Sequence, residues 1–280
     1  MSMPRPPEAG VILINVLVIL ALMASVVFAM VSLSDISITR SQLYSEAGQG
    51  LELIAAGESS AISALRQDLE ESPENDHLLE SWAQIQQDEV AIEAGLFTLS
   101  IADAQAKLNL NSLSGTGASG MQTLREVLAI LDLPPDVALR IAARLAQRTP
   151  LDRLEELETA AGLTAVEIAR LSELVTVLPG RTDININTAA EELLAVLANN
   201  PVQARNLTGI RNRQGFLRRQ DIVAAGMILP PGVGFSSRFF TVSVDVVIGG
   251  TRQSQISLLQ RHVDRNGRAV VSVVGRQTGF

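Results

Sequence analysis

The sequence has no cysteine, which excludes disulfide bonds and thiolate metal sites. It has only two histidines, His77 and His262, and neither has another metal-binding residue at a ligand-like spacing. It also lacks the G-x-S-x-G turn of serine hydrolases and the phosphate-binding loop of P-loop proteins. Acidic pairs such as Glu155-Glu156 fall in predicted helices, where such residues usually lie on the face that is exposed to solvent. We therefore predict no catalytic residue, and a protein that is not an enzyme.

Basic charge is scarce, and Lys107 is the only lysine. The formal net charge is −8, so we expect no binding of nucleic acid through the overall charge of the protein. Aromatic residues make up only 3% of the chain. We expect its single tryptophan, Trp82, to pack in a core.

A long apolar run stands near the N-terminus. From Val11 to Leu33 the only polar residues are Asn15, Ser25 and Ser32. As a helix, this run spans roughly 34 Å, which is enough to cross the hydrocarbon core of a bilayer. A cleaved secretory signal has a shorter apolar region that ends in an A-x-A site, and this run has no such site. The sequence therefore predicts a retained membrane anchor.

The spacing of apolar residues divides the rest of the chain into predicted helices and strands. An apolar stripe at three- and four-residue steps continues the helix to Pro73, where we expect it to end. A short helix is predicted around 77–87, and residues 97–101 alternate as in a strand. Amphipathic helices follow in series, and alternation returns in the tail as three antiparallel strands.

This order of elements predicts the fold class α+β. A long N-terminal helix, whose first part is transmembrane, packs on a small antiparallel sheet, and a large all-α domain is inserted in that sheet. The expected parts are residues 1–10 as a leader, 11–33 as the transmembrane part of the helix, 34–106 as the helix continuation and first strand, 107–235 as the inserted helical domain and 236–280 as the last strands.

Two motifs in the helical region have both a functional and a structural interpretation. Residues 115–120 fit the G-x-G-x-x-G of dinucleotide-binding folds, but helices follow instead of a βαβ unit, which favours a loop ending at a Ser119 cap. The pattern N-x-N-[S/T] occurs at 108–112 and 184–188, where each copy predicts an extended segment that turns into a helix. Thr188 is expected to cap the second of these helices. A ligand role for the asparagines stays open.

The stretch ININTAAEELLAVL at 184–197 also resembles the start of helix-hairpin-helix modules in DNA-binding competence proteins. Such hairpins place a tight glycine turn against phosphate, whereas the turn here reads ANNPVQ. A membrane-anchored DNA-binding protein of a competence system is the alternative hypothesis. Its phosphate contacts would come from arginines further along the chain, namely Arg205, Arg211, Arg213, Arg218 and Arg219.

Four segments together resemble one family over almost the whole chain. They are GVILINVLVILAL at 10–22, IADAQAKLNLNSL at 101–113, the helical stretch from 150 to 197, and SRFFTVSVDVVIGG at 237–250 with SLLQR after it. That family is the type II secretion minor pseudopilin K (general secretion pathway protein K), which is prepilin-like. The resemblance implies a subunit that caps the pseudopilus tip and nucleates assembly with minor pseudopilins I and J, for export of folded proteins across the outer membrane.

The resemblance also implies how the N-terminus is processed and where the protein lies. Prepilin peptidase would cleave after Gly10, and Val11 would be N-methylated. The apolar run would hold the protein in the bacterial inner membrane as a single-pass helix, with the globular part in the periplasm, and would later pack in the pseudopilus. The bulky helical domain would block further stacking.

The resemblance further implies contact with secreted substrate and other secretion components. Some pseudopilins bind calcium, but no loop here has an aspartate cluster dense enough to name ligands. We therefore assign no cofactor, and the metal ligands stay unknown.

Asn15 stands where ordinary pilins have a glutamate that offsets the N-terminal charge of a neighbouring subunit. A buried carboxylate without a partner amine is costly. A subunit at the tip has no neighbour ahead of it, so a neutral residue at this place agrees with a tip position.

Overall fold

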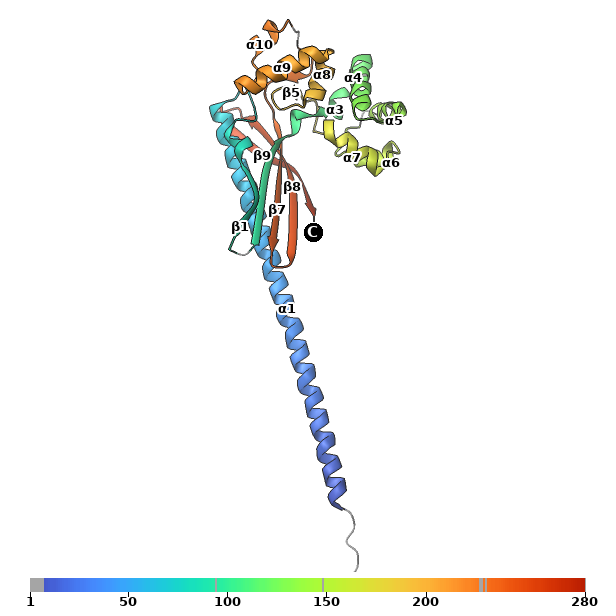
Figure 1. The fold of residues 1–280 in the computed structure, drawn as a ribbon, viewed down its shortest axis with the longest axis vertical. Helices are drawn as coiled ribbons and strands as arrows, with labels where there is room; N and C mark the ends of the chain where they lie inside the picture. The colour runs from blue at the N-terminus through green and yellow to red at the C-terminus, as the bar shows by residue number, and fades with distance from the viewer. Residues whose placement is uncertain (1–7, 94, 148, 227–228, 230, 280) are drawn as a thin grey trace, which may run out of the picture.

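The computed structural model describes residues 8–93, 95–147, 149–226, 229 and 231–279, with the side chains of its first helix described from Ile12 onward. That helix, α1, runs from Glu8 to Glu71. Its first half projects from the head of the molecule as a stem, and its second half lies along the head (Figure 1). The helix ends as predicted, because Pro73 disfavours helical backbone at the residue before it.

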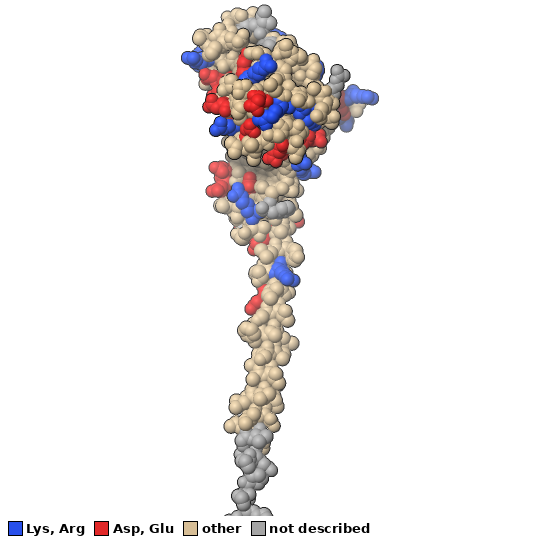
Figure 2. Space-filling view, turned by 90° about the vertical axis from the view of Figure 1, so that its right-hand side faces the viewer, with Lys and Arg blue, Asp and Glu red and all other residues tan. Residues whose placement is uncertain are grey.

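The stem is apolar and exposed. An 18-residue window of α1 has a mean hydropathy of 2.8, and none of it is buried within the protein. By length and composition α1 is able to cross a membrane. Figure 2 shows charged side chains on the head and the upper stem, with uncharged atoms over the described part of the lower stem.

The head contains a five-stranded antiparallel sheet in the order β1-β2-β7-β8-β9. β2 and β7 pair from Gly95 opposite Ile248 to Asp103 opposite Phe240, so the chain between them is an insertion in the sheet. The predicted fold class, a long helix with an antiparallel sheet and an inserted set of helices, is confirmed. The strands are β1 (Gln86–Ile92), β2 (Gly95–Asp103), β7 (Phe239–Ile248), β8 (Thr251–Val263) and β9 (Ala269–Gly279).

The segment before β2 differs from the prediction. The expected helix around 77–87 is wrong, since only Ser81–Gln84 forms a helical turn, α2, and β1 follows it. The strand predicted at 97–101 is therefore the second strand of the sheet. Nearly every residue of β1 is exposed and a bulge interrupts its pairing between Gln87 and Val90, so no hydrophobic alternation marks this edge strand.

The second half of α1 packs on one face of the sheet. Leu65 and the sheet residue Phe240 are fully buried between them. Trp82 packs in the same core, as expected, with its ring centroid 5.0 Å from that of Phe240. Gly57 allows close approach, because an added Cβ there would lie 3.1 Å from the ring of Phe97. Burial of these large apolar side chains fixes α1 to the sheet.

The insertion forms the end of the head farthest from the stem (Figure 1). It is mostly helical, but two short pairs of parallel strands close it, so the expectation of an all-α domain is corrected on this point. The strands are β3 (Leu108–Asn109) with β4 (Val175–Thr176), and β5 (Ile184–Asn185) with β6 (Val233–Gly234). The helices are α3 (Leu110–Leu113), α4 (Gly117–Ile130), α5 (Pro135–Leu145), α6 (Glu156–Ala160), α7 (Ala165–Leu174), α8 (Glu191–Ala198), α9 (Pro201–Gln214) and α10 (Arg219–Ala224), after a 3-10 turn at Ala104–Ala106.

The insertion contains the same arrangement twice. Each unit begins with an N-x-N strand, continues through helices and ends with the strand that pairs in parallel with the first. The helix pairs α4–α5 and α8–α9 correspond, and both α5 and α9 begin with a proline at the first helical position. The two units share one hydrophobic core, so neither buries its apolar face alone.

Candidate functional site

The second asparagine of each N-x-N motif stabilises its own helical unit. In each copy the first asparagine accepts a hydrogen bond at Oδ1 from the backbone N–H of the second, at 3.1 Å in Asn109 and 3.0 Å in Asn185. The second asparagine then pairs with both backbone groups of a distant leucine. Asn111 accepts from Leu151 N–H at 2.9 Å and donates to its carbonyl at 2.8 Å.

Asn187 repeats this contact in the second unit. Its Oδ1 accepts from Leu217 N–H at 2.7 Å, and its Nδ2 donates to the Leu217 carbonyl at 3.4 Å. The extended segments predicted at both copies are confirmed, since β3 and β5 begin there. Because the amides bond to backbone and are buried, we assign these asparagines to the fold and not to a ligand.

Replacing Asn187 with alanine is expected to lower the free energy of unfolding by about 2 kcal/mol, because the buried N–H and carbonyl of Leu217 lose their partner. Urea unfolding of the full chain in detergent measures this change. Asn206→Ala, on the exposed side of α9, is the matched control and should change stability by under about 0.5 kcal/mol. Equal effects of the two substitutions would contradict the structural role of Asn187.

Both predicted helix caps lie elsewhere. α8 begins after Ala190, and the Thr188 hydroxyl instead donates to Asp103 Oδ2 at 2.5 Å. α4 begins after Thr116, which places Ser119 inside the helix, where its hydroxyl donates to the Thr116 carbonyl. The partner of the Thr188 hydroxyl is 85 residues away in the sequence, and spacing alone does not reveal such a partner.

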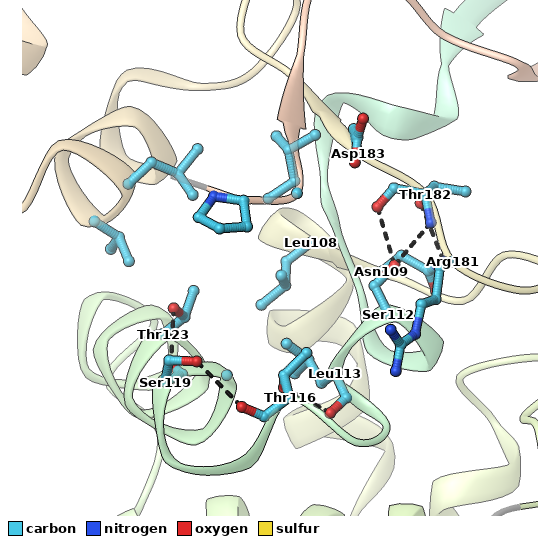
Figure 3. A pocket seen from close by; sticks show the side chains of 16 residues that line it. Leu108, Asn109, Ser112, Leu113, Thr116, Ser119, Thr123, Arg181, Thr182 and Asp183 are labelled. Carbon is cyan, nitrogen blue, oxygen red and sulfur yellow. Dashed lines mark hydrogen bonds between the residues drawn. The ribbon is translucent and has the colours of Figure 1, made fainter. Parts of the chain in front are cut away.

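A pocket of about 420 Å³ lies beside the G-x-G-x-x-G segment. Figure 3 shows Thr116, Ser119 and Thr123 on one side and Arg181 and Asp183 on the other. The three hydroxyls and the Arg181 guanidinium bond within the protein. For example, the Arg181 guanidinium donates to the Ser114 carbonyl at 2.6 Å. The strand before the segment, β3, has two residues and helices follow it, so the fold of a dinucleotide site is not formed here.

A buried polar junction joins the stem helix, the sheet and the helical insertion. At its centre the Arg261 guanidinium, from β8, donates to Asp68 Oδ2 of α1 at 2.6 Å and also bonds to Asp76 in the loop after α1. Arg261 is 1% exposed, and both carboxylates are buried with it. Asp76 also accepts from the backbone N–H of Ser237, just before β7. One guanidinium therefore fixes the end of α1 to the sheet.

Asp103, at the end of β2, continues the junction into the insertion. Its Oδ2 accepts hydrogen bonds from the Ser237 hydroxyl at 2.7 Å and from Asn185 Nδ2 at 2.9 Å, besides the one from Thr188. Asn185 also donates to the carbonyl of Asp76 at 3.0 Å. These contacts set the position of the helical insertion on the sheet.

The junction holds more carboxylates than cations. Burial raises the pKa of Asp76 to about 7 against the opposing charge of Arg261. Burial likewise raises the pKa of Asp68 and of Asp103, although hydrogen bonds to both carboxylates act in the other direction. Desolvation disfavours the ionised form of a carboxyl group, so a proton is held here near neutral pH.

The junction does not fit calcium. Oxygen atoms of Asp68, Asp76 and Glu80 lie within 4.8 Å of one another. However, the Arg261 guanidinium already bonds to the first two carboxylates. Calcium requires six to eight oxygen ligands, and a neighbouring fixed cation repels it. Among the described residues we therefore assign no ligands for the calcium that the family resemblance suggested.

The three processing and tip residues predicted from the sequence lie on α1. Residues 1–7 of the leader are outside the described residues. The backbone of Gly10 and Val11 belongs to α1, but the side chain of Val11 is outside the described part of the structure. Asn15 is exposed on the stem. Cleavage after Gly10, methylation of Val11 and the tip role of Asn15 stay predictions.

The sequence did not predict the polar junction, because its members are far apart in the chain. Asp76 and Arg261, for example, are 185 residues apart.

The arginines of the DNA-binding hypothesis divide into two groups. Arg211 points inward and donates to the carbonyls of Ile186 at 3.0 Å and Ala189 at 2.6 Å, which holds α9 against the start of α8. The other four guanidinium-bearing residues, Arg205, Arg213, Arg218 and Arg219, are exposed. The hypothesis thus loses one of its five expected phosphate contacts, that of Arg211.

No protein-family model matches the chain. The chain is 26% identical to the type II secretion system protein K of Pseudomonas aeruginosa, over 97% of this chain and 94% of that protein. It is 27% identical to the protein of the same name from Klebsiella pneumoniae, over 91% of this chain and 93% of that protein.

A solved structure has the same fold. It is the GspK-GspI-GspJ complex of the type 2 secretion system of enterotoxigenic Escherichia coli, in which the matching chain superposes with a TM-score of 0.66 at 24% identity. The match covers 86% of this chain and 99% of that one. The two relatives are similar in sequence over nearly the full length, and the solved structure is similar in fold. These findings confirm the predicted resemblance to the type II secretion minor pseudopilin K.

Proposed function

We propose that the protein is the tip subunit of a type II secretion pseudopilus, where it nucleates assembly and caps the filament. The supporting observation is the position of the insertion. The helices α3–α10 lie at the end of the molecule opposite the N-terminal end of α1 (Figure 1). In a filament whose subunits pack through their N-terminal helices, this insertion occupies the space in which a further subunit would stack.

The partners in this proposal are minor pseudopilins I and J. The solved relative is in a complex with GspI and GspJ, and this chain has the same fold over almost all of that relative's length. The uncharged Asn15 on the exposed stem agrees with a subunit that has no neighbour ahead of it. Before assembly, the apolar stem holds the protein in the inner membrane, and the head lies in the periplasm, where folded secretion substrates are available.

Co-expression of the chain with pseudopilins I and J from the same bacterium tests the partners. We expect the three proteins to co-purify from detergent extracts as one complex of equal stoichiometry. A chain that elutes alone while I and J still bind each other would contradict the proposal.

Capping is tested separately by removing the insertion. Asp103 and Phe240 are paired in the sheet, so a short linker from residue 103 to residue 239 joins β2 to β7 without changing their register. We expect this variant to bind I and J and to give longer filaments than the full chain. Filaments of unchanged length, from a variant that still binds I and J, would show that the insertion does not cap.

We also propose that prepilin peptidase removes residues 1–10 and that Val11 becomes N-methylated. Intact-mass measurement of the protein extracted from membranes should show the loss of those ten residues and the gain of one methyl group. Gly10→Leu should retain the leader. A mature protein that begins at Met1 would refute the processing.

A further inference from the structure

One segment at the outer end of the head is predominantly basic, although the neighbouring helix α8 begins with two exposed glutamates, Glu191 and Glu192. The chain as a whole has a net charge of −8, but residues 200–226, which include α9 and α10, contain five arginines and a single acidic residue, Asp221. α9 itself has three arginines and no acidic residue over 14 residues. We define the α9–α10 surface as the exposed side chains of Arg205, Arg213, Arg218 and Arg219.

These four guanidinium groups are available to a partner. Across the part of the chain that the structure describes, none of them lies within 4.0 Å of a carboxylate oxygen. Arg211 differs, since backbone carbonyls take its donors. On the side of the head formed by α4–α7, by contrast, basic and acidic side chains are interspersed (Figure 2).

Two of the arginines are held in place by aromatic rings. The Arg218 guanidinium lies 4.9 Å from the centre of the Phe216 ring, and that of Arg219 lies 5.8 Å from the centre of the Phe235 ring. His77 stacks on Phe216 at 4.5 Å. A guanidinium that lies over an aromatic ring keeps the N–H groups at its edge free for a carboxylate, and less side-chain entropy is lost on binding.

A hollow of about 290 Å³ adjoins the Phe216 ring. Phe216 and Arg218 line it together with Gln214 and Gln220. It therefore combines an apolar surface with several hydrogen-bond donors. A carboxylate side chain with its methylene stem fits this combination, because the stem packs on the ring and the oxygens accept from guanidinium and amide groups.

The geometry favours a protein partner over nucleic acid. Helix-hairpin-helix modules bind phosphate with the free N–H groups at the start of the second helix. Here the Asn200 side chain accepts from the N–H of Val202 at 2.9 Å and of Gln203 at 3.3 Å. Pro201, the first residue of α9, has no N–H. The net negative charge of the chain also repels a polyanion at longer range.

We propose that the α9–α10 surface docks an acidic patch on a partner protein that approaches the head from beyond its outer end. Figure 1 shows α9 and α10 at the end of the molecule opposite the stem, so such a partner can reach them while α1 is packed in a membrane or a filament. The docking needs only folded protein and exposed charge, and it therefore does not depend on capping.

Fluorescence anisotropy of a labelled glutamate-rich peptide with the full chain in detergent tests this proposal. The variant Arg205→Gln, Arg213→Gln, Arg218→Gln is expected to bind about tenfold more weakly at low salt. The control removes three exposed arginines from other parts of the head, Arg125→Gln, Arg153→Gln, Arg170→Gln, and should change binding less than about twofold. Raised salt should weaken binding by the unchanged chain.

Three results would overturn the proposal. They are equal weakening by the two triple variants, equal binding of a peptide with glutamine in place of glutamate, and tighter binding of a 20-bp DNA duplex than of the peptide. Co-purification of the surface variant with pseudopilins I and J is measured in parallel. If the variant binds I and J but not the peptide, docking is separated from assembly.

Discussion

Arg261→Met is expected to lower the free energy of unfolding by about 3–5 kcal/mol, the largest loss of stability that we predict for a single substitution in this chain. Methionine fills a similar volume but leaves Asp68 and Asp76 buried without the guanidinium that now bonds to both. Arg261 also donates to the Ser237 carbonyl at 3.0 Å, so the same change frees a buried acceptor. Urea unfolding of the full chain in detergent measures the loss.

The cost of this substitution should rise with pH. The folded-state pKa of Asp76, about 7, lies above its ordinary value of 3.8, so folding takes up a proton between these values. The contribution of Asp76 to stability is complete below about pH 4 and is lost as the pH rises to about 7. At pH 8 the Arg261→Met protein buries an additional unpaired negative charge, which a protonated Asp76 avoids at pH 5.

A substitution on the same strand provides the control. Arg252 of β8 pairs with Asp245 at 3.2 Å, but its side chain is 74% exposed. Arg252→Met should cost under about 1 kcal/mol, because solvent screens an exposed ion pair. Adding Asp76→Asn to Arg261→Met should restore part of the stability at pH 8. Equal costs for the two arginines, or no change between pH 5 and pH 8, would show that the junction does not hold the head on α1.

Two arginines in the stem should move the protein out of the membrane. Leu20 and Met23 lie near the middle of the apolar run and are exposed. Each arginine at the centre of a membrane-spanning helix costs about 2.5–3.5 kcal/mol, so Leu20→Arg with Met23→Arg opposes insertion by roughly 6 kcal/mol. The measurement is the share of the chain that floats with membranes after a carbonate wash.

The control places the same charges at the same spacing outside the apolar run. Ser41→Arg with Tyr44→Arg changes two exposed residues of α1 that lie between the run and the head. This variant should float with membranes as the unchanged chain does. If the Leu20 and Met23 variant also floats fully, the run is not the anchor. Since neither pair contacts the head, thermal unfolding of the head should be the same in both variants.

The local elements of the fold follow from the sequence. The uninterrupted apolar run and Pro73 determine α1 and its end, and strict alternation determines β7, whose residues are buried at every second position. Such patterns depend on the period of a single segment, and that period is set by backbone geometry alone. β1 has no buried face of its own, so its sequence carries no such period.

The repeated N-x-N motif is visible in the sequence, but the distant backbone groups to which its second asparagine bonds are not. Asn111 and Asn187 bond to Leu151 and Leu217, which lie 40 and 30 residues away. Spacing within the motif predicts the local turn correctly, because one asparagine bonds to the backbone two residues on. The distant partner is decided by how the helices pack.

By itself the sequence determined the apolar stem, the insertion of helices into an antiparallel sheet and the resemblance to one family. Each of these depends on the pattern of residues within a segment or on the order of segments along the chain. Only the tertiary structure decided that Asp68, Asp76 and Asp103 meet near Arg261, and that Arg211 is turned inward while the four arginines near it in the sequence stay exposed. The physical reason is that charged residues far apart in the sequence come together when helices and strands pack. The spacing of charged residues within one segment does not indicate which residues they will contact.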